Sequence, residues 1–416
     1  MAKIAVLGHG VVGSGVCEVI HENQESIIRR AGQPIEVKRI LDLRDFDGLP
    51  YRDKFTKNFD DILNDDEISI VVEVMGGVSP AFEFSVASLK KGKSVVTSNK
   101  ELVAAKGAQL LKIARENNCN YFFEASVGGG IPIIRPMHMC LAANEIDEIA
   151  GILNGTTNFI LTKMIKEGTS FDEALKTAQD LGYAERNPAA DVEGYDACRK
   201  ICILASLAFG RHVYPEYVHT EGITKITLED VAYAESWGGV IKLIGEAKRI
   251  PESERIECLV APAFVNGESQ LANIDDVFNG VLVRGNATGD VVFYGKGAGK
   301  LPTASAVVAD VIHEAKVSGT STSLTWKDSS ENFVLPYDEV ESAFYVRAAG
   351  FRDSSFAKER ISVLFHGASF LSRAGQPESE AAFVTESMSG GLLMKKVEAL
   401  KEKGAEILSV IRVADC

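Results

Sequence analysis

Four acids and a lysine lie within one short stretch of the chain, from Gly182 to Lys200. The acids are Glu185, Asp191, Glu193 and Asp196. An apolar run, ICILASLAF, follows at once and predicts a buried helix. Charged groups that lead directly into a buried helix cost free energy unless they are paired or used in chemistry. The stretch is therefore either a capped helix start with one ion pair or part of a functional site.

Asp196 and Lys200 are expected on one face of that helix. The helix should begin between Asp191 and Gly194 and end at Gly210, which puts Asp196 in its first turns. Lys200 follows four residues later, about one helical turn along. Asp191 is either the N-cap of the helix or a member of the same acidic group.

A glycine-rich loop near the N-terminus predicts a dinucleotide site. The β-rich run KIAVL precedes GHGVVGSG, and a helical stretch follows. Gly8, Gly10 and Gly13 match the G-x-G-x-x-G pattern, which lets the backbone approach a pyrophosphate at a helix N-terminus. Val11 and Val12 complete the predicted cofactor loop. The other interpretation is a glycine-rich turn that binds nothing.

The next strand, IEVKRILDL, should end beside the ribose of the cofactor. Asp42 would accept a hydrogen bond from a 2′-hydroxyl and favour NAD, whereas Arg44 would pair with a 2′-phosphate and favour NADP. Because both residues are present, the choice between NAD and NADP stays open.

Strands and helices keep alternating to about residue 135, which predicts a doubly wound parallel sheet, the Rossmann fold. Ligands of such sheets bind beyond the carboxyl ends of the strands, where Gly76, Ser98 and Lys100 fall. Lys100 opens a helix, and a cation there opposes the helix dipole. That local conflict favours a functional charge over an ordinary surface lysine.

The remainder predicts an α+β domain over residues 136–301. Its last strand runs into a second glycine-rich loop, GKGAGKLPTASAV, where Gly297 and Gly299 can let the backbone lie close to a cofactor. A flexible hairpin end is the alternative. A helix at about 302–317, with Pro302 at its first position, is expected to complete the Rossmann domain of residues 1–135.

Two further segments follow. Residues 318–342 are rich in Ser and Thr and predict a linker. Residues 343–416 predict the order β-α-β-β-α-β, which is the ferredoxin-like arrangement.

Composition and charge exclude several classes of protein. The chain has 416 residues and a formal net charge of −14, which argues against non-specific binding of nucleic acid or anionic membranes. No apolar run has the length of a transmembrane helix, and the N-terminus lacks the layout of a signal peptide. The seven scattered cysteines include no C-x-x-C, which favours a reduced, cytoplasmic protein.

Together these segments resemble the homoserine dehydrogenase family. The stretch from Ala178 to Lys200 is similar to the family signature at every fixed position, and GHGVVGSG, TSNK, EASVGGGIPII, NGTTNFIL and GAGKLPTASAV are similar to further family segments. The tail over 343–416 resembles a reduced ACT-type regulatory domain. It reads GFRDSSFA where fuller ACT domains have a D-x-P-G-like turn, so we expect it to serve assembly and not threonine feedback.

The resemblance implies the NAD(P)-linked interconversion of L-aspartate-4-semialdehyde and L-homoserine, on the route to threonine and methionine. It implies that Glu185 and Asp196, with Asp191 as a further candidate, bind the amino-acid substrate. Lys200 would transfer the proton. Asp196 beside it favours the charged form of the lysine.

The resemblance implies further site residues as well. Lys100 would lie near the substrate and the nicotinamide, and Gly182 would face the cofactor. A monovalent-cation site, expected to hold sodium, would use the Glu124 carboxylate with three backbone carbonyls, those of Val127, Gly129 and Ile131. A homodimer or homotetramer is expected.

Three other functions are alternatives for a chain with these motifs. The chain could be another Rossmann oxidoreductase, such as an amino-acid dehydrogenase. A semialdehyde dehydrogenase with a nucleophilic cysteine is disfavoured, because no cysteine lies in a motif with a partnered histidine. A regulatory protein that has lost catalysis is disfavoured by the intact set of Glu185, Asp196 and Lys200.

Overall fold

A computed structural model describes residues 1–317, 319–320, 324–329 and 331–416 of the chain. The chain divides into two compact units. Unit 1 comprises Met1–Glu145, Cys202–Pro215 and Gly295–Glu331, and unit 2 comprises Ile146–Ile201, Glu216–Tyr294 and Asn332–Cys416. The finer division into three domains, with boundaries at 135, 301 and 343, stays a prediction.

Unit 1 contains a six-stranded sheet whose pairs are all parallel, in the order β3-β2-β1-β4-β5-β6. This is the strand order of a Rossmann fold, so the predicted class of the N-terminal region is confirmed. The central strands β1 and β4 are mostly apolar because helices cover both faces of such a sheet. The strands are β1 (Ala2–Leu7), β2 (Ile35–Leu41), β3 (Phe55–Thr56), β4 (Ile68–Glu73), β5 (Ser94–Thr97) and β6 (Tyr121–Phe122).

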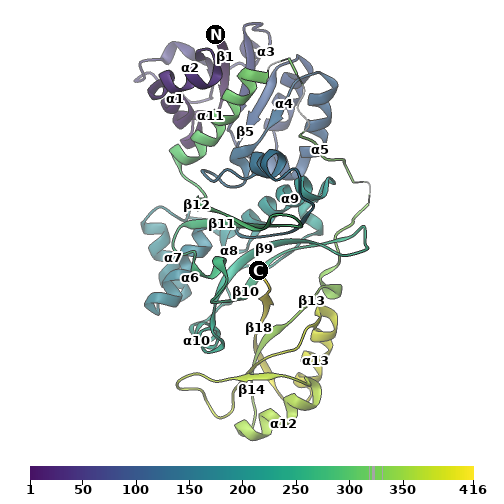
Figure 1. Ribbon diagram of the computed structural model, residues 1–416. Helices are drawn as coiled ribbons and strands as arrows, with labels where there is room; N and C mark the ends of the chain where they lie inside the picture. The colour runs from purple at the N-terminus through teal and green to yellow at the C-terminus, as the bar shows by residue number, and fades with distance from the viewer. Residues whose placement is uncertain (318, 321–323, 330) are drawn as a thin grey trace. The chain divides into compact units, whose positions relative to one another are not determined.

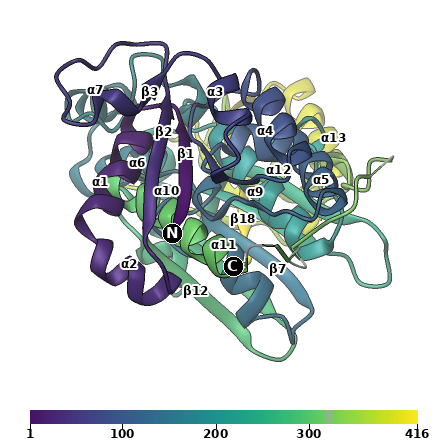
Figure 2. The same cartoon turned by 90° about the horizontal axis from the view of Figure 1, so that it is seen from above.

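The helices of unit 1 include one that returns from much later in the chain. This helix, α11 (Lys300–Val317), packs against α1 (Figures 1 and 2). It begins two residues earlier than predicted, so Pro302 is its third residue and not its first. A proline is tolerated there because the first N–H groups of a helix have no intrahelical acceptor. The other helices are α1 (Val11–Glu22), α2 (Gln24–Ala31), α3 (Asp60–Leu63), α4 (Ala81–Lys90) and α5 (Lys100–Glu116).

The predicted linker at 318–342 is only partly covered. Residues 318, 321–323 and 330 lie outside the described residues. Among the rest, Trp326 is buried, and its indole N–H donates to His212 Nδ1 over 2.8 Å. His212 in turn lies 2.9 Å from the carbonyl oxygen of Ala104 through its Nε2. The part of the segment around Trp326 is therefore packed against the rest of unit 1.

Unit 2 is built on a long mixed sheet, in the order β12-β11-β7-β9-β10-β18-β14-β16-β15, with β8 also paired to β10. The pairs β10–β18 and β10–β8 are parallel, whereas β7, β9, β10 and β11 pair antiparallel with one another. Ten strands form it: β7 (Ile146–Ile152), β8 (His219–Thr220), β9 (Gly239–Arg249), β10 (Ile256–Asn266), β11 (Phe278–Gly285), β12 (Gly289–Lys296), β14 (Phe344–Ala349), β15 (Ser369–Leu371), β16 (Ala381–Val384) and β18 (Glu406–Ala414).

The C-terminal segment has the predicted order β14-α12-β15-β16-α13-β18 (Figure 1). The two helices are α12 (Ser354–Leu364) and α13 (Gly390–Glu402), and a short pair, β13 (Glu341–Ser342) with β17 (Met388–Ser389), lies beside them. Its core includes Phe344, Phe365 and Phe383. β18 also pairs with β10, where Ala263 faces Arg412, so the segment extends the sheet of the preceding residues.

Five helices accompany the middle of unit 2. They are α6 (Gly155–Glu167), α7 (Phe171–Asp180), α8 (Ala189–Val192), α9 (Tyr195–Phe209), which runs into unit 1, and α10 (Leu228–Trp237). The predicted buried helix is α9. It begins at Tyr195, one residue after the predicted range of 191–194, and it ends directly before Gly210, whose φ of +70° stops the helix as predicted.

Glu148 is a buried carboxylate on the sheet of unit 2. It lies on β7 opposite Arg284 of β11, with Oε2 and Nη1 2.5 Å apart, and is 1% exposed. Burial, together with the negative charge of Glu246, raises the pKa of Glu148 to about 7 despite the arginine. The folded protein therefore holds this proton more tightly than the unfolded chain does.

We expect this group to make the stability depend on pH. Its contribution is fully present below the ordinary pKa of 4.5 and is lost as the pH rises through about 7. Glu148→Gln should therefore flatten the fall of the thermal unfolding midpoint across that window. Asp147→Asn, on the neighbouring half-buried position, is the matched control. An unchanged slope in Glu148→Gln would contradict the assignment.

Candidate active site

The loop between β1 and α1 has the geometry of a dinucleotide-binding turn. Gly8 has a φ of +97°, and a Cβ on Gly13 would lie 1.9 Å from the carbonyl oxygen of Gly8. Both positions therefore require glycine. Gly10 is the N-cap of α1 and makes no side-chain cap, so Val11 and Val12 begin a helix whose terminal N–H groups suit an anion.

Asp42 and Arg44 meet beside this loop. The backbone N–H of His9 donates to Asp42 Oδ2 over 2.8 Å. Arg44 donates two side-chain hydrogen bonds to the same carboxylate, from Nε to Oδ1 at 3.0 Å and from Nη2 to Oδ2 at 2.8 Å. Arg44 thereby holds the pKa of Asp42 well below its usual range. Asp42 and Arg44, the two residues predicted to contact the ribose of the cofactor, thus form one ion pair beside the loop.

A buried glutamate joins the carboxyl ends of β4 and β5. Glu73 is fully buried, and it accepts hydrogen bonds from the N–H of Met75 at 2.8 Å and from Thr97 Oγ1 at 2.7 Å. Burial raises its pKa. Thr97 Oγ1 also accepts from the N–H of Asn99, whose side-chain amide donates to the carbonyl of Gly77. The turns after both strands are therefore tied together.

Three predicted cofactor residues lie on these two turns. Gly76 follows β4 with a φ of +91°, and the N–H of Ser98 donates to the carbonyl of Glu73. Lys100 is the first residue of α5, whose N-cap Asn99 accepts from the N–H of Leu102. Because β4 and β5 are neighbours in the sheet, these residues share one edge of it.

The carboxylate of Glu124 organises the segment that follows β6. It is 4% exposed and accepts three backbone N–H groups, from Ile133 at 2.6 Å, Ile134 at 2.9 Å and Arg135 at 2.7 Å. Its own N–H donates to Asp310 of α11 over 2.9 Å. Arg135 forms an ion pair with the same aspartate.

Three carbonyl groups of the segment that follows Glu124 were predicted as further hard oxygen ligands. They belong to Val127, Gly129 and Ile131, which are all buried. Within the described part of the chain, no donor is recorded for these oxygens. Gly129 has a φ of +56°, and a Cβ on it would lie 2.3 Å from the carbonyl oxygen of Gly297, so the turn at Gly129 lies against the loop that contains Gly297. Buried carbonyls without donors fit a cation.

In unit 2 the acidic group is organised by Asn154, the N-cap of α6. Its Oδ1 accepts the N–H of Thr157, and its Nδ2 donates to Asp191 Oδ1 at 2.7 Å and to Asp196 Oδ2 at 2.9 Å. Lys200 Nζ donates to the same Asp196 oxygen over 2.7 Å. Asp191 lies within α8, so it joins the acidic group and is not the N-cap of α9.

Lys200 is held from two sides. Besides Asp196, its ammonium donates to the carbonyl oxygen of Leu153 over 2.7 Å. Lys200 is 6% exposed and Asp196 is 3% exposed. Because these two acceptors fix the position of the buried ammonium, its N–H groups point in defined directions. A side chain that donates a proton to a small substrate needs such a fixed orientation.

The loop between α7 and α8 carries two other predicted residues. Gly182 has a φ of +76° and is exposed. Glu185 is exposed too, and its recorded contact is through its carbonyl, which accepts from Gln179 Nε2 at 3.2 Å. The recorded contacts thus join Asp191, Asp196 and Lys200 but do not include Glu185.

Two organising residues were not predicted as site residues. Glu73 lies near the end of the segment EISIVVEV and is the last residue of β4, and a charge at the end of a buried strand is a signal that could have identified it. Asn154 opens the segment NGTTNFIL as a capping residue, but its role as the bridge between two aspartates depends on contacts between distant residues.

Two features are absent from the described residues. No group of three or more His, Cys, Asp or Glu side chains arranged around a possible metal occurs among them. Within the same residues, no helix has the combined length and hydropathy needed to cross a membrane.

The chain is similar to known proteins along most of its length. The family model described as homoserine dehydrogenase matches residues 132–312, and the model described as the homoserine dehydrogenase NAD binding domain matches residues 8–124. The homoserine dehydrogenase of Bacillus subtilis is 42% identical over 350 residues, which cover 82% of this chain and 80% of that protein.

Solved structures agree with these matches. A homoserine dehydrogenase from Thiobacillus denitrificans is 37% identical, with a TM-score of 0.91 over 100% of this chain and 98% of that one. A mutant of a hyperthermophilic archaeal homoserine dehydrogenase in complex with NADPH is 30% identical, with a TM-score of 0.64 over 76% of this chain and 97% of that one. The chain belongs to the homoserine dehydrogenase family of NAD(P)-dependent oxidoreductases.

Proposed function

We propose that this protein is a homoserine dehydrogenase that interconverts L-homoserine and L-aspartate-4-semialdehyde, a step toward threonine and methionine. The observation that carries the proposal is the Lys200 ammonium, which is buried and fixed by Asp196 and the Leu153 carbonyl. Family membership supplies the reaction, and this geometry supplies the proton donor that the reaction needs.

The residues of the chain have distinct roles in this reaction. When bound, NAD(P) supplies or accepts the hydride. Lys200 donates a proton to the aldehyde oxygen during reduction and takes it back from the hydroxyl during oxidation. Asp196 and Asp191 attract the substrate ammonium and favour the charged form of Lys200, which must first lose its proton to act as the base in oxidation. Asn154 is a positioning residue, because it fixes both carboxylates.

Further residues are assigned on the resemblance alone. Glu185 is proposed to bind the substrate ammonium from the exposed loop after α7, and Gly182 to face the cofactor. Lys100 at the start of α5 is proposed to bring a second positive charge to the reacting groups. Gly297 and Gly299 are proposed to border the cofactor.

The cofactor is proposed to be NADP or NAD. The backbone N–H groups after Gly10 suit the pyrophosphate, and Gly76 and Ser98 border the same edge of the sheet. Arg44 keeps a guanidinium at the ribose end, which supports NADP, because a 2′-phosphate can replace Asp42 as its partner. The archaeal relative in complex with NADPH supports the same preference.

The competing functions fit the chain less well. An amino-acid dehydrogenase and a regulatory protein are both disfavoured by the family match and by the intact Asp196–Lys200 pair. A cysteine nucleophile is disfavoured because burial raises the pKa of Cys17, Cys119, Cys258 and Cys416, which keeps those thiols in their less reactive form.

Sodium is proposed to bind Glu124 and the carbonyls of Val127, Gly129 and Ile131. The carboxylate already accepts three N–H groups, so the three carbonyls would supply most of the coordination. We assign the ion a bracing role between the segment after β6 and the loop at Gly297. No chemical step depends on it.

The tail over 343–416 is proposed to be a reduced ACT-type domain that serves assembly of a homodimer or homotetramer. Its Asp353 caps α12 through the N–H of Phe356 and pairs with Arg352, so the residue aligned with the missing effector turn already has a structural role. The free cysteines support a reducing compartment, and we propose the cytoplasm.

L-Homoserine with NAD⁺ or NADP⁺ at alkaline pH should yield the reduced cofactor, measured by its absorbance, with the faster initial rate for NADP⁺. Lys200→Ala should lower kcat by about 100- to 10,000-fold, the range for a lost general acid. Its cofactor affinity should stay near that of the parent. Lys176→Ala, an exposed lysine on α7, is the matched control.

Two outcomes would contradict this account at different levels. If neither cofactor gives a homoserine-dependent signal, the proposed reaction is wrong. If Lys200→Ala keeps near-parent turnover, the reaction stands but the proton donor lies elsewhere.

Sodium should raise the thermal unfolding midpoint of the protein, because an ion that binds only the folded state stabilises it. NaCl is compared with choline chloride at equal ionic strength, since choline is too large for a cage of carbonyls. Glu124→Gln should abolish the difference, and Glu116→Gln on the exposed side of α5 should keep it. A sodium effect that survives in Glu124→Gln would refute the site.

The tail is tested by adding L-threonine to the same assay. The rate should not change, because the effector turn is missing. Inhibition by threonine that disappears in a variant of the 343–416 segment would show that the tail is a regulatory domain after all.

A further inference from the structure

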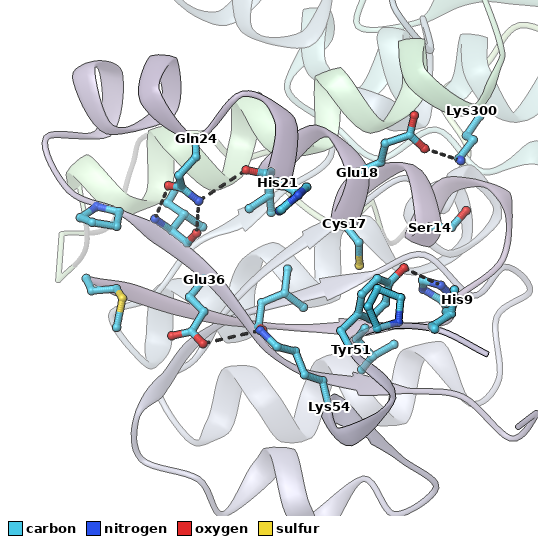
Figure 3. A pocket seen from close by; sticks show the side chains of 18 residues that line it. His9, Ser14, Cys17, Glu18, His21, Gln24, Glu36, Tyr51, Lys54 and Lys300 are labelled. Carbon is cyan, nitrogen blue, oxygen red and sulfur yellow. Dashed lines mark hydrogen bonds and ion pairs between the residues drawn. The ribbon is translucent and has the colours of Figure 1, made fainter. Parts of the chain in front are cut away.

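A cavity of about 810 Å³ lies in unit 1 against the helix that follows the cofactor loop (Figure 3). Its walls come from α1, from β2 and from the segment 49–54. Among the described residues that line it, none belongs to the predicted cofactor or substrate sites. Its volume is in the usual range for sites that bind small organic molecules, about 300–1,000 Å³. The cavity is therefore large enough for a ligand of its own.

Most of the cavity surface is apolar. Ile20 on α1 and Ile35, Val37 and Ile40 on β2 line it, and all four are buried. The side chain of Cys17 points from α1 into the space (Figure 3). Burial raises the pKa of this thiol to about 11, so it is uncharged at neutral pH. These groups suit a flat apolar molecule.

The charged groups of the lining are balanced in two ion pairs. Lys300 Nζ lies 2.5 Å from Glu18 Oε2, and Lys54 Nζ lies 3.6 Å from Glu36 Oε1 (Figure 3). Lys54 also donates to the carbonyl of Val37 over 2.6 Å. Since the side chains of Glu18 and Glu36 offset those of Lys300 and Lys54, the side chains of the lining offer no net charge to an ionic ligand. We therefore expect a ligand of this cavity to be uncharged.

One end of the cavity carries a polar group that is not satisfied. His9 is 6% exposed, and its Nδ1 has no hydrogen-bond partner among the described residues. The other ring nitrogen lies 3.5 Å from the hydroxyl of Tyr51. Burial lowers the pKa of His9 and raises that of Tyr51, so both groups are neutral. A buried nitrogen without a partner costs free energy that a ligand hydroxyl would recover.

Two aromatic rings of the lining meet at this end. His9 and Tyr51 lie edge-on, with ring centroids 5.9 Å apart. Phe46 and Phe55 do not line the cavity; they pack edge-on against His9 at 4.9 and 5.0 Å and hold its ring in place. The rings of His9 and Tyr51 favour another aromatic ring, because rings gain from edge-to-face and offset contacts.

We propose that this cavity binds a small, uncharged aromatic molecule, whose ring lies on the apolar wall and whose hydroxyl group bonds to His9 Nδ1. A hydroxyl both donates and accepts, so it serves either neutral tautomer of the histidine. The site uses none of the proposed substrate residues, and it adjoins the cofactor loop only at His9, between Gly8 and Gly10. The proposal does not depend on the proposed reaction, because binding is measured without substrate.

The probe is 2-naphthol, titrated into the full-length protein and followed by calorimetry at neutral pH. Saturable binding of one molecule per chain is expected. Replacing the hydroxyl by a methyl group, in 2-methylnaphthalene, should weaken binding about fivefold, the usual effect of one neutral hydrogen bond. The anion 2-naphthoate should bind more weakly still, because its charge finds no partner.

Variants locate the probe. Cys17→Phe should fill the cavity from α1 and weaken 2-naphthol about tenfold or more, the equivalent of about 1.4 kcal/mol. Leu49→Trp fills it from the facing segment and decides the question if Cys17→Phe does not fold. Cys140→Phe makes the same exchange at an exposed position outside the cavity and should bind like the parent.

Four results would overturn the proposal. They are the absence of saturable binding, equal binding by the filled variants and Cys140→Phe, displacement of 2-naphthol by saturating NADP⁺, and binding of 2-naphthoate as tight as that of 2-naphthol. Equal affinity for 2-methylnaphthalene would remove His9 from the site.

Discussion

The burial of the Lys200 ammonium is the constraint on which the substrate side of this protein depends. An ammonium taken out of water costs several kcal/mol unless acceptors replace the lost water. Asp196 and the carbonyl of Leu153 do so at 2.7 Å each, and Asn154 holds Asp196 from the other side. Removing the carboxylate would leave a buried charge uncompensated, at a cost of about 3–5 kcal/mol. The same contacts that make the lysine tolerable in the interior also fix its direction.

The cofactor half of the protein uses the same principle at the carboxyl ends of parallel strands. Glu73 is buried, and among the described residues it has no cationic partner, so the hydrogen bonds from Met75 and Thr97 must offset the desolvation that raises its pKa. Those bonds fix the two turns that carry Gly76, Ser98 and Lys100. In each unit, then, a buried charged or polar group needs hydrogen-bond partners. The contacts that satisfy it also fix the backbone segments that carry the proposed site residues.

Much of this arrangement could be predicted from the sequence, because local signals specify it. Glycines at 8, 10 and 13 after a short apolar strand predicted the turn between β1 and α1, and Gly210 marked the end of α9. The order of elements after residue 343 followed from alternation of period two and 3.6. Spacing of four residues placed Asp196 and Lys200 on one helix face, where they form their ion pair.

What the sequence did not reveal depends on contacts between distant residues. The bridge from Asn154 to two aspartates joins residues 37 and 42 positions apart. The pairing of β18 with β10 joins the tail to the middle sheet, and no periodicity within either strand encodes its partner. Glu185 lies on a loop, where spacing does not determine the direction of a side chain, and its role stays a prediction.

The most direct test of the central claim is a crystal structure of the protein with L-homoserine and NADP⁺ bound. The account predicts the hydroxyl oxygen of homoserine within about 3 Å of Lys200 Nζ, a normal hydrogen-bond distance, and the substrate ammonium against the carboxylates of Asp196 and Asp191. A homoserine hydroxyl bonded to another donor, with Lys200 still held by Asp196 and Leu153 and out of reach, would contradict it.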